Sequence, residues 1–525
     1  MERLIDRLGD SLGFKRVGTN ELRSLAEFEQ WADGSKVRFR GRVPAARFAS
    51  DAGVVLGGAD GPLLVSRRFG FGRVSVFGPD LNAAPLKAWR DRDALIEKAA
   101  LLGRPELPSS LQVANAASLD GSIGGQLDRA LATFDVEELP RANVYVGLIL
   151  LAVLFGPLEY LLVHKVFKRP KLTWATLPLL CVASWYALTA SGTASTNVAG
   201  GPRAKSVTLV DEVVAADGGL PNVPPVVSRS RTLFAMASDR HARFDLRVTD
   251  AAAGPGPVAI GWHAPPGEQF GGRDRPGRLD PSAPEYVVDA AERTVAAWPI
   301  PAGGAKMLRI LGSVGTPPAA SLAGRLSSPG SRLRGTLVNT TDQDLVDCRL
   351  IYGGRVYWPN LDGLLPAGET WDLEAAETGG ATRTRYLRRS QVTMVDVGSS
   401  SSRNEKLASE AARLRETDYD ARGRNVSRIV EVLSLYRAAG GPDYTGLTDA
   451  GTENDDLSLW LEEGYAVFLG RVAAPAAPLE VDGLAADRFD ATTIRRVVLP
   501  VTAAGSSVDR DLPELDPNKR DKDAG

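Results

Sequence analysis

Two long apolar segments near the middle of the chain constrain its fold more than any other feature. Residues 144–163 (VYVGLILLAVLFGPLEYLLV) contain a single charge, Glu159, and residues 172–194 (LTWATLPLLCVASWYALTASGTA) contain none. A helix of about 20 apolar residues can cross the hydrocarbon core of a bilayer while satisfying its own backbone hydrogen bonds. We therefore expect a two-helix transmembrane hairpin over residues 143–195. The alternative is a buried helical hairpin in a soluble fold.

The connection between these segments, residues 164–171 (HKVFKRPK), is short and basic. Short loops rich in Lys and Arg stay in the cytoplasm, so the turn is expected inside and both soluble regions outside the cell membrane. Glu159 then lies near the cytoplasmic interface, where local anchoring is favoured over a functional role.

The amino terminus, MERLIDRLGDSLGFKRV, is charged throughout and contains no apolar core of a signal peptide. Export of the region before the hairpin therefore requires an upstream signal. The expectation is that the natural start lies upstream of Met1, and the alternative is that the N-terminal region is cytoplasmic.

Composition excludes several classes of function. The 525 residues include 62 Lys and Arg against 64 Asp and Glu, with 3 His and 2 Cys. A balance close to zero argues against nucleic acid as a partner, because phosphate binding needs a basic face. Two cysteines cannot build a disulfide framework or a four-thiolate metal site. The 54 Gly and 34 Pro favour turn-rich β structure.

Hydrophobic patterning divides the soluble regions. Residues 1–140 combine helical spacing with short apolar runs and predict an α/β domain, whereas residues 203–395 contain short strands separated by Gly- and Pro-rich turns, typical of a β-sandwich. Residues 403–502 predict a smaller α+β region, and 503–525 a disordered tail. The expected fold class is a multidomain membrane protein with a partial α/β N-terminal domain, a transmembrane hairpin and a β-sandwich-rich C-terminal region.

Glycines at positions 70 and 72 superficially resemble a phosphate-binding loop. Such a loop stands between a strand and the helix that follows it, whereas Gly70-Phe71-Gly72 precedes a strand-like run, as in a hairpin turn. No cysteine occurs in residues 1–140, so this region offers no thiol nucleophile. Cys348 lies within a predicted strand, where a small buried residue is the ordinary interpretation.

The C-terminal region contains a few further candidate groups. Acidic side chains between positions 443 and 456 could supply oxygen ligands for calcium, but they lack the EF-hand pattern, so a solvated loop or helix start is favoured. His241 and His263 have no metal-ligand or triad spacing around them. Adjacent helical residues point about 100° apart, so Glu462 and Glu463 are not expected to act as a pair. The acidic loop contains Asp443, Tyr444, Asp449, Glu453, Asp455 and Asp456. We assign no catalytic, cofactor-binding or metal-binding residue, and expect no cofactor.

Several segments together resemble one family. These are GPLEY at 156–160, Arg169-Pro170, LTW at 172–174, Pro178, RRFGFGRVSVFGPDL, LVNTTDQDLVDCRLIYGGRVY and RAAGGPDYTGLTD. They are similar to segments of uncharacterised bacterial two-span membrane proteins that carry a glutamine-amidotransferase-like or von Willebrand A-like domain before the hairpin. The resemblance implies an extracytoplasmic β-rich C-terminal part and no established reaction. The 140 residues before the hairpin match only the end of that first domain.

Three functions remain open from sequence. The leading hypothesis is a membrane-anchored envelope protein with non-catalytic binding or scaffolding domains. Its expected partner is the lipid bilayer, and nucleic acid is not expected as a partner. The rival is an enzyme or enzyme subunit with its site in the N-terminal α/β domain or upstream of it. The third is an accessory subunit of a membrane complex, associating through small residues of the spans such as Gly147 and Ser184.

Overall fold

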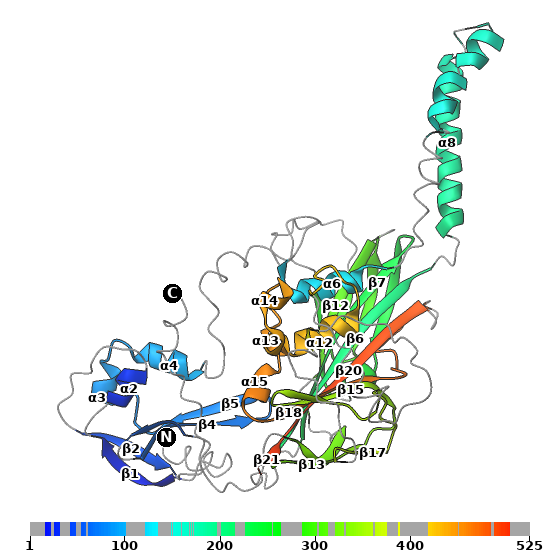
Figure 1. The fold of residues 1–525 in the computed structure, drawn as a ribbon. Coiled ribbons are helices and arrows are strands. Elements are labelled where there is room, and N and C mark those ends of the chain that lie inside the picture. The colour runs from blue at the N-terminus through cyan, green and yellow to red at the C-terminus, as the bar shows by residue number, and fades with distance from the viewer. Residues whose placement is uncertain are drawn as a thin grey trace, which may run out of the picture.

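The computed structural model describes a body of β-sheets and helices, a smaller N-terminal unit and a projecting arm (Figure 1). The residues that it describes are 16–22, 26–31, 42–48, 54–58, 61–100, 121–134, 149, 151–158, 160–166, 168–169, 171, 173–196, 201–215, 226–254, 256–263, 286–301, 304–312, 315, 321–329, 332–360, 363–374, 387–388, 418–449, 451–482, 484 and 488–503.

An eight-stranded sheet runs through the body in the order β16-β15-β18-β20-β6-β7-β12-β9. Every neighbouring pair is antiparallel except β20 and β6, which are parallel. The strands therefore come from both sides of the boundary expected between residues 395 and 403. Their bounds are β6 Arg203–Val214, β7 Val226–Ser238, β9 Val258–His263, β12 Gly304–Gly312, β15 Leu345–Tyr352, β16 Arg355–Tyr357, β18 Ala466–Val472 and β20 Phe489–Leu499.

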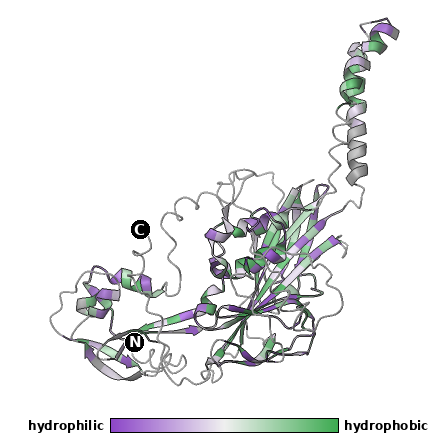
Figure 2. Cartoon of the chain, in the orientation of Figure 1, coloured by the Kyte–Doolittle hydropathy of each residue, from purple (hydrophilic) through white to green (hydrophobic). Residues whose placement is uncertain are grey.

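Two four-stranded sheets cover one face of this large sheet. Phe234, Trp298 and Ile310 belong to a core between β6, β7 and β12 and the sheet β10-β11-β8-β19, while Leu350, Trp371 and Phe468 belong to a core beneath the sheet β17-β14-β13-β21. The alternation of hydrophobic and hydrophilic residues along the strands is visible in Figure 2. The bounds are β8 Ala242–Val248, β10 Val287–Asp289, β11 Thr294–Ile300, β13 Leu322–Ser328, β14 Arg334–Asn339, β17 Thr370–Asp372, β19 Leu479–Val481 and β21 Val501–Ala503.

Helices cover the opposite face of the large sheet (Figure 1). Asn425 caps the first turn of α12 by accepting a hydrogen bond from the Arg428 amide, and Gly440 ends α13 in a left-handed conformation that favours glycine. Ser122 caps α6 in the same way as Asn425 caps α12. The bounds are α6 Ile123–Ala132, α12 Val426–Ser434, α13 Tyr436–Ala439, α14 Pro442–Thr445 and α15 Ser458–Glu462. Their apolar residues and those of the sheet form the largest buried core of the described residues.

The N-terminal unit consists of two small sheets and short helices. The expected hairpin turn at Gly70 is confirmed, because β4 and β5 pair on either side of it and Gly70 has a positive φ of 53°. The tip of this hairpin reaches the helical layer of the body (Figure 1). The bounds are β1 Arg16–Leu22, β2 Val43–Phe48, β3 Val54–Gly58, β4 Gly61–Phe69, β5 Gly72–Phe77, α2 Ala26–Trp31, α3 Ala84–Lys87 and α4 Arg92–Ala100.

The expected fold class, a multidomain membrane protein with a two-helix transmembrane hairpin, is wrong, and so is its multi-pass character. Among the described residues, no helix combines the length and the apolar character that crossing a membrane requires. The first apolar segment is interrupted by π-helical turns at Leu154–Leu158, which contains Pro157, and at Leu161–Val166. Polar residues and Pro178 dilute the apolar character of α8 (Thr173–Thr196). Glu159 lies outside the described residues.

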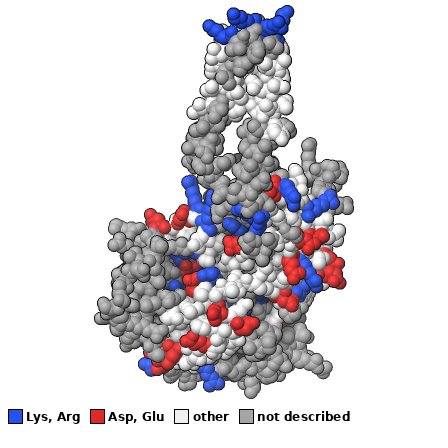
Figure 3. Space-filling model, turned by 90° about the vertical axis from the view of Figure 1, so that its right-hand side faces the viewer, with Lys and Arg blue, Asp and Glu red and all other residues white. Residues whose placement is uncertain are grey.

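The helix α8 projects away from the sheets as an arm (Figure 1). Trp174, Leu179 and Tyr186 on this helix are exposed by 70% or more. Basic side chains gather at the far end of the arm (Figure 3), where the exposed residues Lys165, Lys168, Arg169 and Lys171 lie.

Candidate functional site

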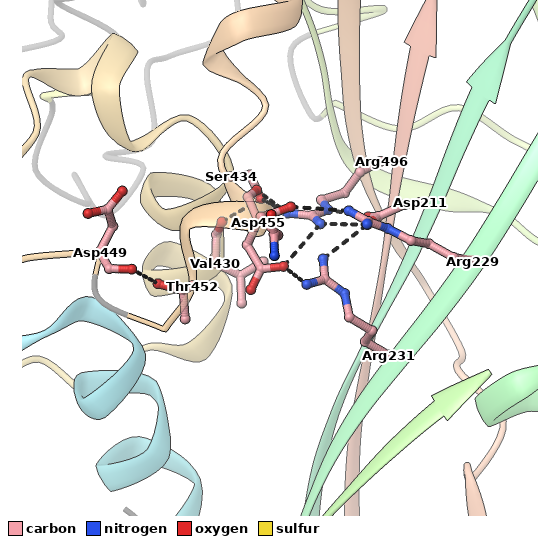
Figure 4. A network of polar contacts seen from close by, with 10 residues as sticks. Asp211, Arg229, Arg231, Val430, Ser434, Asp449, Thr452, Asp455 and Arg496 are labelled. Carbon is pink, nitrogen blue, oxygen red and sulfur yellow. Dashed lines mark hydrogen bonds and ion pairs between the residues drawn. The ribbon is translucent and has the colours of Figure 1, made fainter. Parts of the chain in front are cut away.

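Three strands of the large sheet bring a row of charges together on its helix-covered face. Arg496 on β20 pairs in register with Asp211 on β6, and Asp211 pairs in register with Arg229 on β7. Residues paired in this way project to the same face. Arg231, two positions further along β7, also projects to that face, so three arginines converge on one carboxylate (Figure 4).

Asp211 is the centre of this cluster and is almost completely buried. Nε and an Nη of Arg496 donate to its two carboxylate oxygens at 2.5 and 2.8 Å, a bidentate pairing. Arg229 and Arg231 donate to Oδ2 at 2.9 and 3.0 Å. Burial alone would raise the pKa of Asp211, but the charges of Arg496, Arg231 and Arg229 hold it well below its usual range. The carboxylate is therefore permanently ionised at neutral pH.

The same arginines connect the sheet to the helical layer. Arg496, which has no exposed side-chain area, donates to the Ser434 hydroxyl at 3.0 Å and to the Asp455 carbonyl oxygen at 2.8 Å. The Asp455 carboxylate forms an ion pair with Arg231 (Figure 4). A buried guanidinium without such partners would cost several kcal/mol, so these contacts fix the position of α12 and of the loop that contains Asp455.

A cavity of about 90 Å³ lies beside this cluster, between α6 and the sheet. Arg231 forms part of its wall, and so does Arg309 on β12, which is paired in register with Leu233, two residues from Arg231 on β7. The two guanidinium groups therefore stand on adjacent strands and on one face. The other lining residues are Ser122, Gly124, Gly125, Leu127, Asp128, Val207, Leu209, Thr232, Leu233, His263, Leu433, Gly451, Thr452 and Asp455.

An imidazole–carboxylate pair forms another part of the cavity wall. Nε2 of His263, at the end of β9, lies 2.8 Å from Oδ1 of Asp128 on α6. The Asp128 side chain is only 7% exposed, so this contact ties the helix to the edge strand of the sheet. The pair is one of several polar groups in the wall, which also contains Arg231, Arg309 and Asp455.

Charged groups of both signs line the cavity. They are the guanidinium groups of Arg231 and Arg309 and the carboxylates of Asp128 and Asp455, so these four charges balance. In the part of the chain that the structure describes, Arg309 has no ion-pair partner, and Nε of Arg231 is buried without a hydrogen-bond partner.

The pKa of Arg231 is shifted by its surroundings. Burial is the main cause that lowers this pKa, to about 9. The charge of Asp211 raises the pKa, and the neighbouring charges of Arg496 and Arg229 lower it further. A buried cation with cationic neighbours is stabilised by any additional negative charge.

The acidic residues predicted to form a solvated loop or helix start divide into two groups. Asp443 and Glu453 are exposed in the first turns of α14 and of the 3-10 helix Glu453–Asp455, as predicted, whereas Asp449, Asp455 and Asp456 are buried. Asp455 pairs with Arg231, and Asp456 accepts a hydrogen bond from Nε of Arg437 at 2.8 Å, with both aspartates buried. Among the described residues, no three His, Cys, Asp or Glu side chains are grouped as metal ligands. Burial raises the pKa of Asp449, which reflects its partly enclosed position.

Other candidates lie apart from one another. Glu463 accepts two hydrogen bonds from Arg68 of the N-terminal hairpin, whereas Glu462 is exposed, so the two do not act as a pair. His241 is exposed on the turn before β8. Cys348 is buried in the core beneath the sheet β17-β14-β13-β21, as expected for a structural residue.

Most of the charged residues in and beside the cavity were not predicted from the sequence. Arg229 and Arg231 lie on β7, a segment that was not predicted as a strand, and Asp128 lies on α6, which was not predicted as a helix. His263 was interpreted as a surface or turn residue. The one available signal was the Ser122-Ile123-Gly124-Gly125 start of α6, where a capping serine precedes an apolar periodic run.

No protein-family model matches the sequence, and no curated protein matches it. The chain is similar in structure to the Mu homology domain of Fcho1 from Danio rerio with a bound Eps15 peptide, with a TM-score of 0.22, 8% identity, and coverage of 58% of this chain and 97% of that one. The yeast delta-COP-I mu-homology domain complexed with a Dsl1 peptide has a TM-score of 0.27, 8% identity, and coverage of 57% and 98%. At these TM-scores the similarity assigns no fold, ligand or partner to this chain.

Proposed function

We propose that this protein is a non-catalytic binding protein whose ligand is a small anion held between Arg231 and Arg309 in the cavity beneath α6. The observation that carries the proposal is Arg309, a guanidinium group of the cavity wall that has no ion-pair partner among the described residues. Guanidinium groups bind carboxylate and phosphate oxygens through paired hydrogen bonds. The first turn of α6 adds the positive end of a helix dipole to the same cavity.

A binding role is favoured over catalysis because the hydroxyl groups of the cavity already serve the structure. The Ser122 hydroxyl caps α6, that of Thr232 is hydrogen-bonded to the Thr208 hydroxyl at 2.9 Å, and that of Thr452 donates to the Asp449 carbonyl oxygen at 2.9 Å. Nucleophilic catalysis requires a nucleophile that is hydrogen-bonded to its base. Among the described residues, the hydrogen bond of the His263 ring is to Asp128.

Titration calorimetry with the full-length protein tests the proposal. Sodium phosphate, sulfate, acetate and butyrate at constant ionic strength would be compared with chloride, and we expect saturable binding of at least one of them. Arg309→Gln should weaken that binding at least tenfold, because one of the two guanidinium groups is lost. Arg243→Gln on β8 is the matched control, since Arg243 is exposed and lies outside the cavity lining. Absence of binding by every anion would refute the proposal.

A further inference from the structure

We propose that the arm, residues 149–196, is a docking surface for an anionic lipid bilayer. The arm comprises the π-helical turns Leu154–Leu158 and Leu161–Val166, the basic residues at its far end, and α8. In this contact, apolar side chains of the arm enter the boundary between lipid headgroups and acyl chains, and the basic side chains bind lipid phosphates. The contact is made at one face of the bilayer, requires no membrane-crossing helix, and is independent of the anion in the cavity.

The arm carries most of the exposed apolar surface of the described residues (Figure 2). Nine of the fourteen large hydrophobic side chains that are exposed among these residues lie on it, and Trp174 is exposed by 88%. None of its described side chains belongs to one of the buried hydrophobic cores. Exposed apolar surface concentrated on one element marks an interaction site, whereas single scattered residues do not. The nine residues are Ile149, Val153, Tyr160, Leu161, Trp174, Leu177, Leu179, Val182 and Tyr186.

The exposed apolar side chains of α8 are not confined to a narrow stripe. At about 100° per residue, the five from Leu177 through Trp174 and Val182 to Tyr186 and Leu179 span about 200° of the helix circumference. A helix that packs against a single protein partner buries a narrower stripe and keeps a polar face toward water. A surrounding apolar medium, such as the acyl region of a bilayer, covers so wide a surface better than one groove does.

Amphipathic aromatic residues are distributed along the arm. Trp174 and Tyr186 are exposed on α8 and stand about 18 Å apart along its axis. Tyr160 lies on the other side of the basic end, where its exposed ring stacks on His164 with the ring centroids 4.6 Å apart. Trp and Tyr side chains favour the boundary between headgroups and acyl chains. Their distribution therefore fits an arm that lies along this boundary.

The far end of the arm provides charge complementarity to anionic lipids. Lys165, Lys168, Arg169 and Lys171 are exposed there (Figure 3), and no Asp or Glu occurs in residues 160–202. Each basic side chain at an anionic membrane surface strengthens binding about fivefold. The arm of a second copy of this chain has the same positive charges and no carboxylate in this segment, so it cannot neutralise them. The charge therefore favours lipid over a second copy as the occupant.

Vesicle flotation with the full-length protein tests the proposal. Vesicles of phosphatidylcholine alone would be compared with vesicles that also contain phosphatidylglycerol. We expect binding to be at least tenfold tighter when phosphatidylglycerol is present, and to weaken as the ionic strength rises, because salt screens the basic side chains. Absence of binding to the anionic vesicles, or equal binding to both kinds, overturns the proposal.

A pair of charge variants tests the role of the far end. Lys168→Gln combined with Arg169→Gln should weaken binding to anionic vesicles about twentyfold, because two basic side chains are lost. Arg332→Gln combined with Arg334→Gln is the matched control, since both arginines are exposed at and beside β14 and lie outside the arm. Equal weakening by the two pairs would show that the overall charge of the protein, and not the arm, directs binding, and would overturn the proposal.

A second pair of variants tests the apolar contribution. Trp174→Ala removes the most exposed large side chain of the arm and should weaken vesicle binding about tenfold, because burial of its ring in lipid is lost. Trp262→Ala, exposed by 55% on β9, makes the same change outside the arm and should leave binding unchanged. A protein that does not float but forms a dimer that Trp174→Ala dissociates would have a second copy on the arm, which overturns the proposal.

Discussion

The ring of Phe71 covers the guanidinium group of Arg229, whose central carbon lies 4.3 Å from the ring centroid. Phe71 occupies the tip of the β4–β5 hairpin, more than 150 residues away in sequence from Arg229. Nε of the same arginine donates to Asp211 at 2.9 Å. The N-terminal unit is therefore in direct contact with the ion-pair cluster of the large sheet.

Replacement of Phe71 tests this connection. Phe71→Ala removes a cation–π contact that contributes about 0.5–2 kcal/mol, so Arg229 should become more mobile and Asp211 should lose part of its positive surroundings. We expect anion affinity in the cavity to change by twofold or more, measured by the same titration calorimetry. Phe77→Ala, at the other end of β5 within the N-terminal unit, is the control for general loosening of that unit. Equal effects of both changes would argue against transmission through Arg229.

Glu463 holds the hairpin against the helical layer. Its carboxylate accepts two hydrogen bonds from Arg68 at 2.7 Å each and pairs with Arg73, and Arg68 also lies over the ring of Trp460. Glu463→Gln leaves two partly buried guanidinium groups without a counter-charge, which should cost about 1–3 kcal/mol at this contact. We expect faster amide hydrogen exchange in β4 and β5, with exchange in β6 and β20 unchanged.

The neighbouring glutamate supplies the control for that change. Glu462 is exposed and is the last residue of α15, so Glu462→Gln makes the same chemical substitution without touching the hairpin. Its exchange profile should match that of the wild type. If the amides of β4 and β5 are protected from exchange equally well in both variants, Glu463 does not hold the hairpin against the helical layer.

Asp211 should dominate the stability of the sheet. Asp211→Asn leaves Arg496 buried with one fewer charge partner, and breaking a buried ion pair typically costs about 3–5 kcal/mol. The pKa of Asp211 in the folded state lies below its unfolded value of about 3.9. The contribution of Asp211 to the free energy of unfolding is therefore fully present above about pH 3.9, and it is lost as the pH falls through the folded-state pKa. Urea unfolding at pH 7 should therefore separate wild type and variant widely, and the difference should shrink below about pH 4.

An exposed ion pair gives the comparison for this effect. The Asp250 side chain is 76% exposed and pairs with Arg293 at 2.7 Å, so Asp250→Asn should change the free energy of unfolding by less than about 1 kcal/mol. A similar loss in both variants, or a difference for Asp211→Asn that is undiminished between pH 7 and pH 3, would contradict the assigned role of the buried cluster.

The strands of the body were largely predictable because their signals are local. The runs at 244–248, 307–311, 345–352 and 466–472 alternate or are continuously apolar, and β8, β12, β15 and β18 lie there. The helical segment after Asn425 was predictable in the same way, since its N-cap, apolar face and glycine stop all lie within sixteen residues. Local patterns of this kind determine element type without knowledge of neighbours.

The candidate site was not predictable by the same means. β7 contains two arginines, Arg229 and Arg231, before its apolar run, so the start of the strand resembles a loop in polarity until Asp211 and Arg496 are placed beside it. Those partners come from strands about 20 and 265 residues away in sequence. Which charges are buried thus depends on how the strands pair in the tertiary structure, and the periodicity of a single segment does not indicate this.

The two cysteines should differ sharply in reactivity. Cys348 is fully buried, and burial raises the pKa of its thiol to about 12, against a partial opposing effect of Arg349. Since the thiolate is the reactive form, this thiol should resist alkylation at pH 8 in the folded protein, whereas Cys181 on α8 is exposed and should react. Iodoacetamide labelling followed by mass spectrometry should find one modified site in the native protein and two after unfolding in urea. Labelling of Cys348 at the rate of Cys181 would show that the core containing Leu350 and Phe468 opens readily, contrary to its close packing.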